Sequence, residues 1–311
     1  MSAEGRPVSA PLRVLLSGRF DAGEREAWAA ELARQLPGVQ WLDDAAADAA
    51  PAGIAAAVVA NPAPGRLARL PDLRLIQSLW AGVDKLLADR TLPAHVPIAR
   101  MVDPAMNAAM AETALWAVLA LHRGFFTYQA QQRQARWQPL PQRRADEVPV
   151  LVLGRGQMGG TAAARLAAQG YPVQTWGRAD GDIAPQLAPA QIVVNLLPLT
   201  LATRGLIDAR FLAALPRGAS VVNLARGAHV VDADLLAALD AGHIGHAVLD
   251  VFHTEPLPAN HPYWLHPRVT VLPHAAAATD ERSAAAVVAV NLRALQAGAP
   301  LLHLVDRSRG Y

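Results

Sequence analysis

A glycine-rich segment near the middle of the chain, Gly154-Arg155-Gly156-Gln157-Met158-Gly159, constrains the fold more than any other feature. An apolar run at residues 148–153 precedes it, which is typical of a buried strand, and an amphipathic helical pattern at 161–169 follows it. In this strand–turn–helix setting the GxGxxG spacing predicts a dinucleotide site. The first glycine permits the tight turn, the second lets the backbone approach a pyrophosphate, and the third lets the helix pack on the strand. A Gly-rich turn without any ligand is the structural alternative.

The position of this motif predicts two domains. About half of the 311 residues precede it, and they must fold before the nucleotide domain begins. Short apolar runs alternate with helical patterns along the chain, which favours an α/β fold with parallel sheets. Six strands are expected after residue 147, the number in a full dinucleotide-binding fold. The expected strands lie at residues 13–17, 39–42, 55–60, 73–78 and 96–99, and then at 148–153, 172–176, 191–197, 220–225, 244–250 and 269–273.

Helical patterns set the expected domain limits. One runs after Pro104 from about Met106 to Arg123 and resumes to Gln134. Another begins near Thr279, runs to about Leu295 and leads into an apolar segment at 301–305, and we expect it to cross back to the first domain. We therefore predict two doubly wound parallel-sheet, Rossmann-like domains with a cleft between them. Residues 1–103 and 283–311 would form a flavodoxin-like substrate domain, and residues 104–282 an inserted dinucleotide-binding domain. Asp232 is expected to cap a helix that ends at Gly242.

Composition excludes several classes of function. The chain has no cysteine, which removes disulfides, thiolate nucleophiles and cysteine metal sites, and we expect no metal. No stretch reaches 18 consecutive apolar residues, so neither a membrane span nor a membrane partner is expected. The first eleven residues contain no apolar signal-peptide core, so a cytoplasmic location is expected. The net charge is +2 with scattered arginines, which gives no support for nucleic-acid binding.

Chemically active side chains follow three of the predicted strands. Arg226 follows the strand at 220–225, Asp250 ends the strand at 244–250 with Glu255 five residues later, and His274 follows the strand at 269–273. Ligands bind at the carboxyl ends of strands in open α/β sheets. A cation, two carboxylates and a histidine beside a nucleotide suit hydride transfer on a 2-keto acid. The cation would hold the carboxylate, and the histidine would protonate the developing alkoxide.

Each of these residues also has an ordinary structural explanation. Arg226 could be a surface arginine, Glu255 a solvated residue of a proline-rich loop, and His274 a core histidine. Asp250 could cap the next segment of backbone. Their placement at successive strand ends of one sheet is harder to explain in structural terms alone.

The same residues carry a resemblance to a known family. Asn223-Leu224-Ala225-Arg226-Gly227, then Leu249-Asp250-Val251-Phe252 with Glu255-Pro256-Leu257, then Leu272-Pro273-His274, are similar in order and spacing to the D-2-hydroxyacid dehydrogenases. Residues 77–84 (QSLWAGVD) resemble the substrate loop of that family. The similarity covers essentially the whole chain. It extends to residues 137–141 (WQPLP) and 305–311 (VDRSRGY), which resemble the bacterial glyoxylate/hydroxypyruvate reductase A branch.

The resemblance implies a role for each matching residue. Arg226 would bind the substrate carboxylate and carbonyl, His274 would be the general acid, and Glu255 its carboxylate partner. The backbone N–H groups of Trp80, Ala81 and Gly82 would hold the substrate carboxylate. The implied substrate is a small 2-keto acid such as glyoxylate or hydroxypyruvate, and the implied assembly is a homodimer around the helices after Pro104, with Trp137 near the partner's cleft. Expected cofactor contacts, besides the glycine-rich turn, are Gly177, Arg178, Leu197, Pro198, Ala225 and Asp250.

The end of the second nucleotide strand indicates which nicotinamide cofactor is used. NAD enzymes place an acid there for the ribose 2′-hydroxyl, whereas this strand ends in Trp176-Gly177-Arg178. An arginine can pair with a 2′-phosphate, so NADPH is favoured. Asp180 and Asp182, slightly further along, keep NADH possible.

The chain departs from the sequence pattern of this family at two places, and one alternative to an enzymatic function stays open. Many family members have His-Ile-Gly-Gly where this chain has His274 followed by three alanines, and reductase A relatives have a tryptophan at the strand end occupied here by Ala60. We expect Ala60 to widen the substrate pocket. The alternative to an enzyme is a non-enzymatic NAD(P) sensor resembling the corepressors built on the same scaffold, which also keep the arginine, glutamate and histidine.

Overall fold

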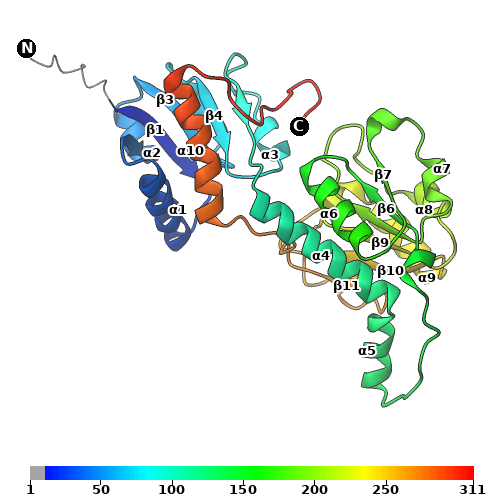
Figure 1. Ribbon diagram of the computed structural model, residues 1–311. Helices are drawn as coiled ribbons and strands as arrows, with labels where there is room; N and C mark the ends of the chain where they lie inside the picture. Colours follow the sequence, from blue (N-terminus) through cyan, green and yellow to red (C-terminus); the bar gives the residue numbers. More distant parts are fainter. Residues whose placement is uncertain (1–10) are drawn as a thin grey trace, which may run out of the picture. The chain divides into compact units, whose positions relative to one another are not determined.

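The chain forms two compact units, shown in Figure 1 as a computed structural model that describes residues 11–311. The first consists of the described residues up to Asp103 together with Thr279–Tyr311, and the second of Pro104–Ala278. The second unit thus lies between two parts of the first in the sequence. The return to the first unit occurs at Thr279 rather than at the expected residue 283. The reason is that Asp280 caps the helix that follows: its Oδ1 accepts the N–H of Arg282 at 2.9 Å.

Unit 1 is built on a parallel sheet of five strands. The strands are β1 (Leu12–Gly18), β2 (Val39–Leu42), β3 (Ile54–Ala60), β4 (Leu75–Ser78) and β5 (Ile98–Ala99). Their order, β2-β1-β3-β4-β5, is that of the flavodoxin-like doubly wound sheet. The helical segments are α1 (Ala22–Gln35), α2 (Asp44–Ala49), η1 (Leu67–Arg69), α3 (Asp84–Leu87) and α10 (Glu281–Ala297).

The C-terminal segment completes unit 1. Helix α10 packs against α1 (Figure 1), and the chain after it reaches β5, where the Val305 N–H donates to the carbonyl of Ile98 at 2.8 Å. A buried amide joins these parts: Asn291 Nδ2 donates to Gln77 Oε1 of β4 at 2.7 Å, and Asn291 Oδ1 accepts the Leu302 N–H at 2.8 Å. Both amide side chains are almost fully buried, so these bonds are needed to offset the loss of solvation.

Unit 2 is built on a parallel sheet of six strands. These are β6 (Val150–Leu153), β7 (Val173–Trp176), β8 (Ile192–Asn195), β9 (Ala219–Asn223), β10 (Ile244–Leu249) and β11 (Val269–Val271), in the order β11-β10-β9-β8-β6-β7. The order reverses between β6 and β8, which makes the carboxyl end of β6 the switch point of the sheet. The helical segments are α4 (Pro104–His122), α5 (Phe125–Arg133), η2 (Ala145–Glu147), α6 (Gln157–Ala168), η3 (Arg178–Asp180), α7 (Ala184–Leu187), α8 (Ala209–Ala213), η4 (Gly227–His229), α9 (Asp232–Asp240) and η5 (Pro262–Trp264).

Helices cover both faces of this sheet. Ala114, Val118 and Leu166 from α4 and α6 pack on one face in a common apolar cluster, and side chains of α8 and α9 such as Leu212 and Leu235 pack on the other. Strands buried on both faces are continuous apolar runs, which is why the sequence marks them so clearly. The two predicted parallel-sheet α/β domains are therefore confirmed.

Some expected details were wrong. Asp232 does not cap α9: the N-cap position is Val231, and Asp232 is the first residue of the helix. Its carboxylate instead accepts the hydroxyl of buried Tyr263 at 2.9 Å. Burial and this neighbouring carboxylate raise the pKa of Tyr263. Helix α6 begins at Gln157, inside the glycine motif, rather than at residue 161.

Within residues 11–311, one helix is long and apolar enough to cross a membrane by length and composition, namely α4. A core helix passes the same test, and the buried face of α4 packs in the apolar cluster with α6 and the sheet. The composition of α4 therefore follows from its place in unit 2.

Candidate active site

The carboxyl ends of the six strands of unit 2 bring the predicted residues of that unit to one edge of the sheet. Parallel strands point the same way, so their following residues lie along a common edge. The edge carries the glycine turn after β6, Gly177 and Arg178 after β7, Leu197 and Pro198 after β8, Ala225 and Arg226 after β9, Asp250 and Glu255 after β10, and His274 after β11. The predicted cofactor and catalytic residues thus come together, except that Trp80, Ala81 and Gly82 lie in unit 1.

The glycine-rich turn has the form that a dinucleotide requires. A Cβ on Gly154, whose φ is +112°, would lie 2.8 Å from the Leu196 carbonyl oxygen, and a Cβ on Gly159 would lie 2.0 Å from the Gly154 oxygen. These two glycines are therefore demanded by the fold itself. A Cβ on Gly156 would meet nothing within 4 Å. Gly156 is also the N-cap residue of α6, and no side chain there accepts the first N–H groups of the helix. These N–H groups are therefore available to a ligand in the open space beside Gly156.

Two buried asparagines shape the turn that carries Arg226. Asn195 Nδ2 donates to Asn223 Oδ1 at 2.9 Å, and Asn223 Nδ2 donates to the carbonyl of Arg226 at 3.0 Å. Both side chains are fully buried. Asn195 was not among the predicted site residues, although a polar residue at the end of an otherwise apolar strand was the available signal. Gly227 lets the backbone of this turn lie close to the backbone of Phe252, because a Cβ at residue 227 would be only 2.0 Å from the Phe252 carbonyl carbon.

His274 and Glu255 form a hydrogen-bonded pair. His274 Nδ1 lies 2.9 Å from Glu255 Oε2, and Glu255 Oε1 accepts the Phe252 N–H at 2.9 Å. The carboxylate is thus fixed by backbone and holds one ring nitrogen, while the imidazole side chain is half exposed. Among residues 11–311, the other ring nitrogen, Nε2, has no hydrogen-bond partner. His274 has a φ of 55°, a left-handed conformation that is uncommon outside glycine, and its N–H donates to the Asp250 carbonyl at 2.9 Å.

Asp250 supports this histidine turn. Its carboxylate is 1% exposed and accepts the N–H of Ala275 at 2.7 Å and that of Ala276 at 3.1 Å. Asp250 therefore caps the backbone of the segment that follows His274, as its structural alternative predicted. The small side chain of Ala276, in the alanine run after His274, packs in the core of unit 2. Its carbonyl accepts the Thr113 hydroxyl of α4 at 2.7 Å.

The region after β7 contains Arg178 and Asp180, which make separate contacts. Arg178 Nη1 donates to the Ala202 carbonyl at 2.8 Å. Arg155, from the glycine-rich turn, forms an ion pair with Asp180, whose Oδ2 also accepts the Gly177 N–H at 2.8 Å. This ion pair was not anticipated.

The predicted substrate loop follows β4 in unit 1. Ser78 Oγ accepts the N–H of Trp80 at 3.0 Å, and the Trp80 carbonyl accepts the Met101 N–H at 3.1 Å. The Trp80 N–H is therefore used within the loop. Within the described part of the chain, the N–H groups of Ala81 and Gly82 make no hydrogen bond, so these two members of the predicted set can still receive a carboxylate.

Ala60 does not widen a pocket as expected. Ala60 is 1% exposed, and a Cβ added at Gly18 would lie only 2.7 Å from the Ala60 Cβ. Ala60 is paired with Gly18 of the neighbouring strand β1, which leaves little free space beside its Cβ. Asn61, the next residue, is the one exposed at this strand end, with a φ of 49°.

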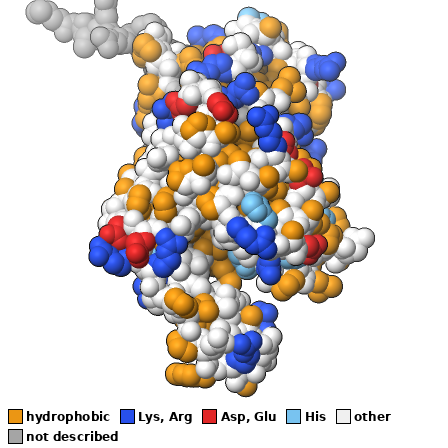
Figure 2. Space-filling view, turned by 90° about the vertical axis from the view of Figure 1, so that its right-hand side faces the viewer, with side chains coloured by type: hydrophobic (Ala, Val, Ile, Leu, Met, Phe, Trp, Pro, Cys, Tyr) orange, Lys and Arg blue, Asp and Glu red, His pale blue; other side chains and the backbone are white. Residues whose placement is uncertain are grey.

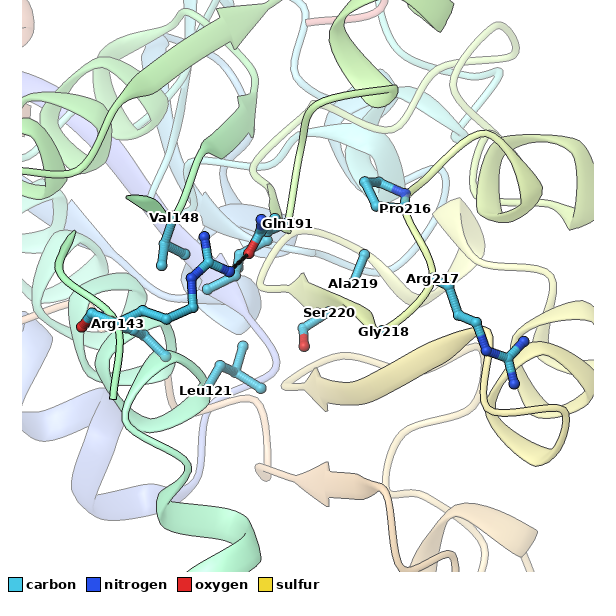
Figure 3. Close-up of a pocket in the computed structure, with 11 residues that line it drawn as sticks. Leu121, Arg143, Val148, Gln191, Pro216, Arg217, Gly218, Ala219 and Ser220 are labelled. Atoms are coloured by element: carbon cyan, nitrogen blue, oxygen red, sulfur yellow. Dashed lines mark hydrogen bonds between the residues drawn. The ribbon is translucent and has the colours of Figure 1, made fainter. Parts of the chain in front are cut away.

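A polar cavity of about 320 Å³ lies elsewhere in unit 2 (Figure 3). It is lined at the amino-terminal ends of β8 and β9, where Arg143 donates to Gln191, while Arg217 extends away from Ser220. Open α/β sheets bind their ligands at the other edge. The candidate active site is therefore the edge that carries His274, not this cavity.

Comparisons with known proteins agree with this geometry. The family model described as D-isomer specific 2-hydroxyacid dehydrogenase, NAD binding domain, matches residues 115–276. Glyoxylate/hydroxypyruvate reductase A of Klebsiella pneumoniae strain 342 is 39% identical over 301 residues, covering 91% of this chain and 96% of the relative.

Solved structures are similar over nearly the whole chain. A D-isomer specific 2-hydroxyacid dehydrogenase from Xanthobacter autotrophicus Py2, in complex with NADPH and MES, has a TM-score of 0.91 at 39% identity, covering 97% of this chain and all of that one. The NADPH-dependent glyoxylate/hydroxypyruvate reductase of Sinorhizobium meliloti, in complex with NADP and sulfate, has a TM-score of 0.88 at 34% identity and covers 96% of this chain and all of that one.

Proposed function

This chain belongs to the D-isomer specific 2-hydroxyacid dehydrogenase family, and from that premise we propose that it reduces small 2-keto acids, glyoxylate and hydroxypyruvate among them, with NADPH. The observation that carries the proposal is the 2.9 Å pair of His274 and Glu255 at the strand edge that also bears Arg226. A relative named glyoxylate/hydroxypyruvate reductase A at 39% identity supports the substrate class.

The proposed cofactor site is the glycine-rich turn and the strand ends beside it. The open space at Gly156 fits a pyrophosphate on the N-terminus of α6. Leu197, Pro198, Ala225 and Asp250 would border the cofactor through backbone or side chain, and Gly177 and Arg178 would border the ribose. Complexes of similar proteins with NADPH and NADP support NADPH as the cofactor. When bound, NADPH supplies the hydride.

The chain's own residues would do the rest. Arg226 would hold the substrate carboxylate and polarise the carbonyl, because a guanidinium presents paired donors to two oxygens. The Ala81 and Gly82 N–H groups would bind the same carboxylate. His274 would give the proton on Nε2 to the carbonyl oxygen as it becomes an alkoxide, while Glu255 orients the ring through Nδ1.

We also propose a homodimer in the cytoplasm. Trp137 is 99% exposed, and it lines an apolar groove of about 530 Å³ with Tyr128 and Pro139. Figure 2 shows apolar side chains gathered on the projecting lower lobe, which is α5 with the segment after it. Exposed apolar patches of this kind mark protein interfaces.

Oxidation of NADPH, followed at 340 nm on adding glyoxylate or hydroxypyruvate, tests the proposal. We expect turnover with both acids, and loss of at least 100-fold in Arg226→Lys, because lysine keeps the charge but loses the paired donors. Binding of NADPH without turnover of any 2-keto acid would favour the non-enzymatic sensor instead.

A further inference from the structure

An acid and an arginine are paired at the place where the ribose of the cofactor is expected. Asp180 ends η3, directly after β7, and its two carboxylate oxygens are both engaged: Oδ1 by Arg155 and Oδ2 by the Gly177 N–H. The Arg155 side chain is 49% exposed and that of Asp180 26% exposed, so a ligand can reach both. A Cβ on Gly177 would lie 3.5 Å from Arg155 Nε, which shows how closely the guanidinium lies against this strand end.

A 2′-phosphate and a 2′-hydroxyl make opposite demands on this pair. A phosphate carries up to two negative charges and requires guanidinium donors, whereas a ribose hydroxyl donates to a carboxylate. Arg155 gives one donor to Asp180 and keeps other N–H groups for a phosphate. A phosphate bound by Arg155 would nevertheless lie beside the Asp180 carboxylate, which is a second anion.

Arg178 does not remove this conflict. Its guanidinium is engaged with another segment, where Nη1 donates to the Ala202 carbonyl at 2.8 Å. A phosphate bound by Arg178 would still lie near the Asp180 carboxylate, because both residues belong to the same three-residue turn.

We infer that Asp180 is a specificity-determining residue that limits the preference for NADPH over NADH, by neutralising Arg155 and by offering its own carboxylate to the ribose 2′-hydroxyl. This inference rests on the proposed function. It makes the enzyme one that uses both cofactors, with NADPH favoured by the arginines and NADH kept in use by Asp180.

The test is equilibrium binding of NADP⁺ and NAD⁺ by calorimetry, with Asp180→Asn as the main variant. Asparagine keeps an oxygen for the Gly177 N–H and removes the charge. We expect the Kd for NADP⁺ to fall about tenfold, the size expected for removing one charge a few ångströms from a phosphate near a protein surface. The Kd for NAD⁺ should stay the same or rise. Adenosine 2′,5′-bisphosphate and AMP, used as smaller probes, should repeat the same difference.

Asp182→Asn is the matched control. Asp182 lies two residues further along the same loop and accepts the Ala184 N–H at 3.2 Å rather than an arginine. Removing its charge should change the ratio of the two dissociation constants less than twofold. Asp180→Ala removes both the charge and the acceptor of the Gly177 N–H, so comparing it with Asp180→Asn separates the effect of charge from that of the turn's shape. It should raise the preference for NADP⁺ as Asp180→Asn does.

An unchanged ratio in a folded Asp180→Asn variant, as judged by its melting temperature, would overturn the inference while leaving the proposed reductase function intact. A shift toward NAD⁺ would overturn it as well. A wild-type protein that binds neither dinucleotide would overturn the proposed function and this inference together.

Discussion

At the scale of single residues, the hydrogen bond between Glu255 and His274 orients the imidazole ring. An imidazole that donates through Nδ1 needs an acceptor there, and Glu255 Oε2 lies 2.9 Å from Nδ1. In Glu255→Gln the amide oxygen can still accept the Phe252 N–H, which turns the amide N–H₂ toward Nδ1. We expect kcat for glyoxylate reduction to fall about 100-fold, since removing such orienting partners has effects of this size or larger.

The binding of NADPH separates this effect from unfolding. The Kd for NADPH should change less than twofold in Glu255→Gln, and His274→Ala should lose turnover while it still binds. A Glu255→Gln enzyme with normal kcat would show that the pair does not serve catalysis.

The sequence predicted these residues for a physical reason. Arg226, Glu255 and His274 follow apolar strands of a parallel sheet, and strand direction alone brings such residues to one edge. The pairing of Arg155 with Asp180 and the burial of Ala60 depend instead on where a side chain points after a turn. Spacing along the chain does not determine that direction, and so these two features emerged only from the structure.

At the scale of elements, α5 packs on the sheet through a partly buried histidine. The ring of His246, in β10, stacks on Phe126 of α5 with centroids 4.3 Å apart and planes 3° apart, and its Nε2 lies 2.9 Å from Thr270 Oγ1. Burial, together with His266 and Arg268, lowers the pKa of His246 to about 4. The folded protein therefore holds this ring neutral.

The stability of the protein should fall with pH through this residue. The pKa of His246 is lower in the folded than in the unfolded state, so this histidine hardly lowers the free energy of unfolding above pH 6.5. The free energy of unfolding falls increasingly as the pH drops from 6.5 toward 4, because the unfolded state binds the proton more tightly. Between pH 7 and pH 5 the loss is about 2 kcal/mol. Urea unfolding at the two pH values should show a smaller loss in His246→Phe, which keeps the stack but cannot take up a proton.

His95→Gln, at an exposed position of unit 1, is the control and should behave like the wild type. An equal loss of stability in His246→Phe and wild type would contradict this prediction.

The elements themselves were largely predictable, because strands buried on both faces are apolar runs and end at polar or glycine residues. The start of α6 was not, since its first turn lies within the glycine motif and lacks a periodic apolar pattern. The role of Asp232 was also missed, because an acid at the start of a helix looks the same in sequence whether it caps that helix or accepts a buried tyrosine.

At the scale of the whole molecule, the proposed homodimer predicts where its interface lies. Trp137 is almost fully exposed beside the groove formed with Tyr128 and Pro139, and buried tryptophans are typical hot spots of interfaces. Trp137→Ser should therefore weaken dimerisation about 30-fold, the equivalent of about 2 kcal/mol. Sedimentation equilibrium over a range of concentrations measures this directly.

Leu201 offers a matched control for this experiment, because it is 97% exposed in the same unit and lies outside the groove. Leu201→Ser removes an equally exposed apolar side chain and should leave the dimer unchanged. If both variants dissociate alike, the groove is not the interface, and a wild-type protein that stays monomeric at high concentration would refute the dimer itself. A dimer that weakens only in Trp137→Ser would explain why an apolar side chain this large is left on the surface of a single chain.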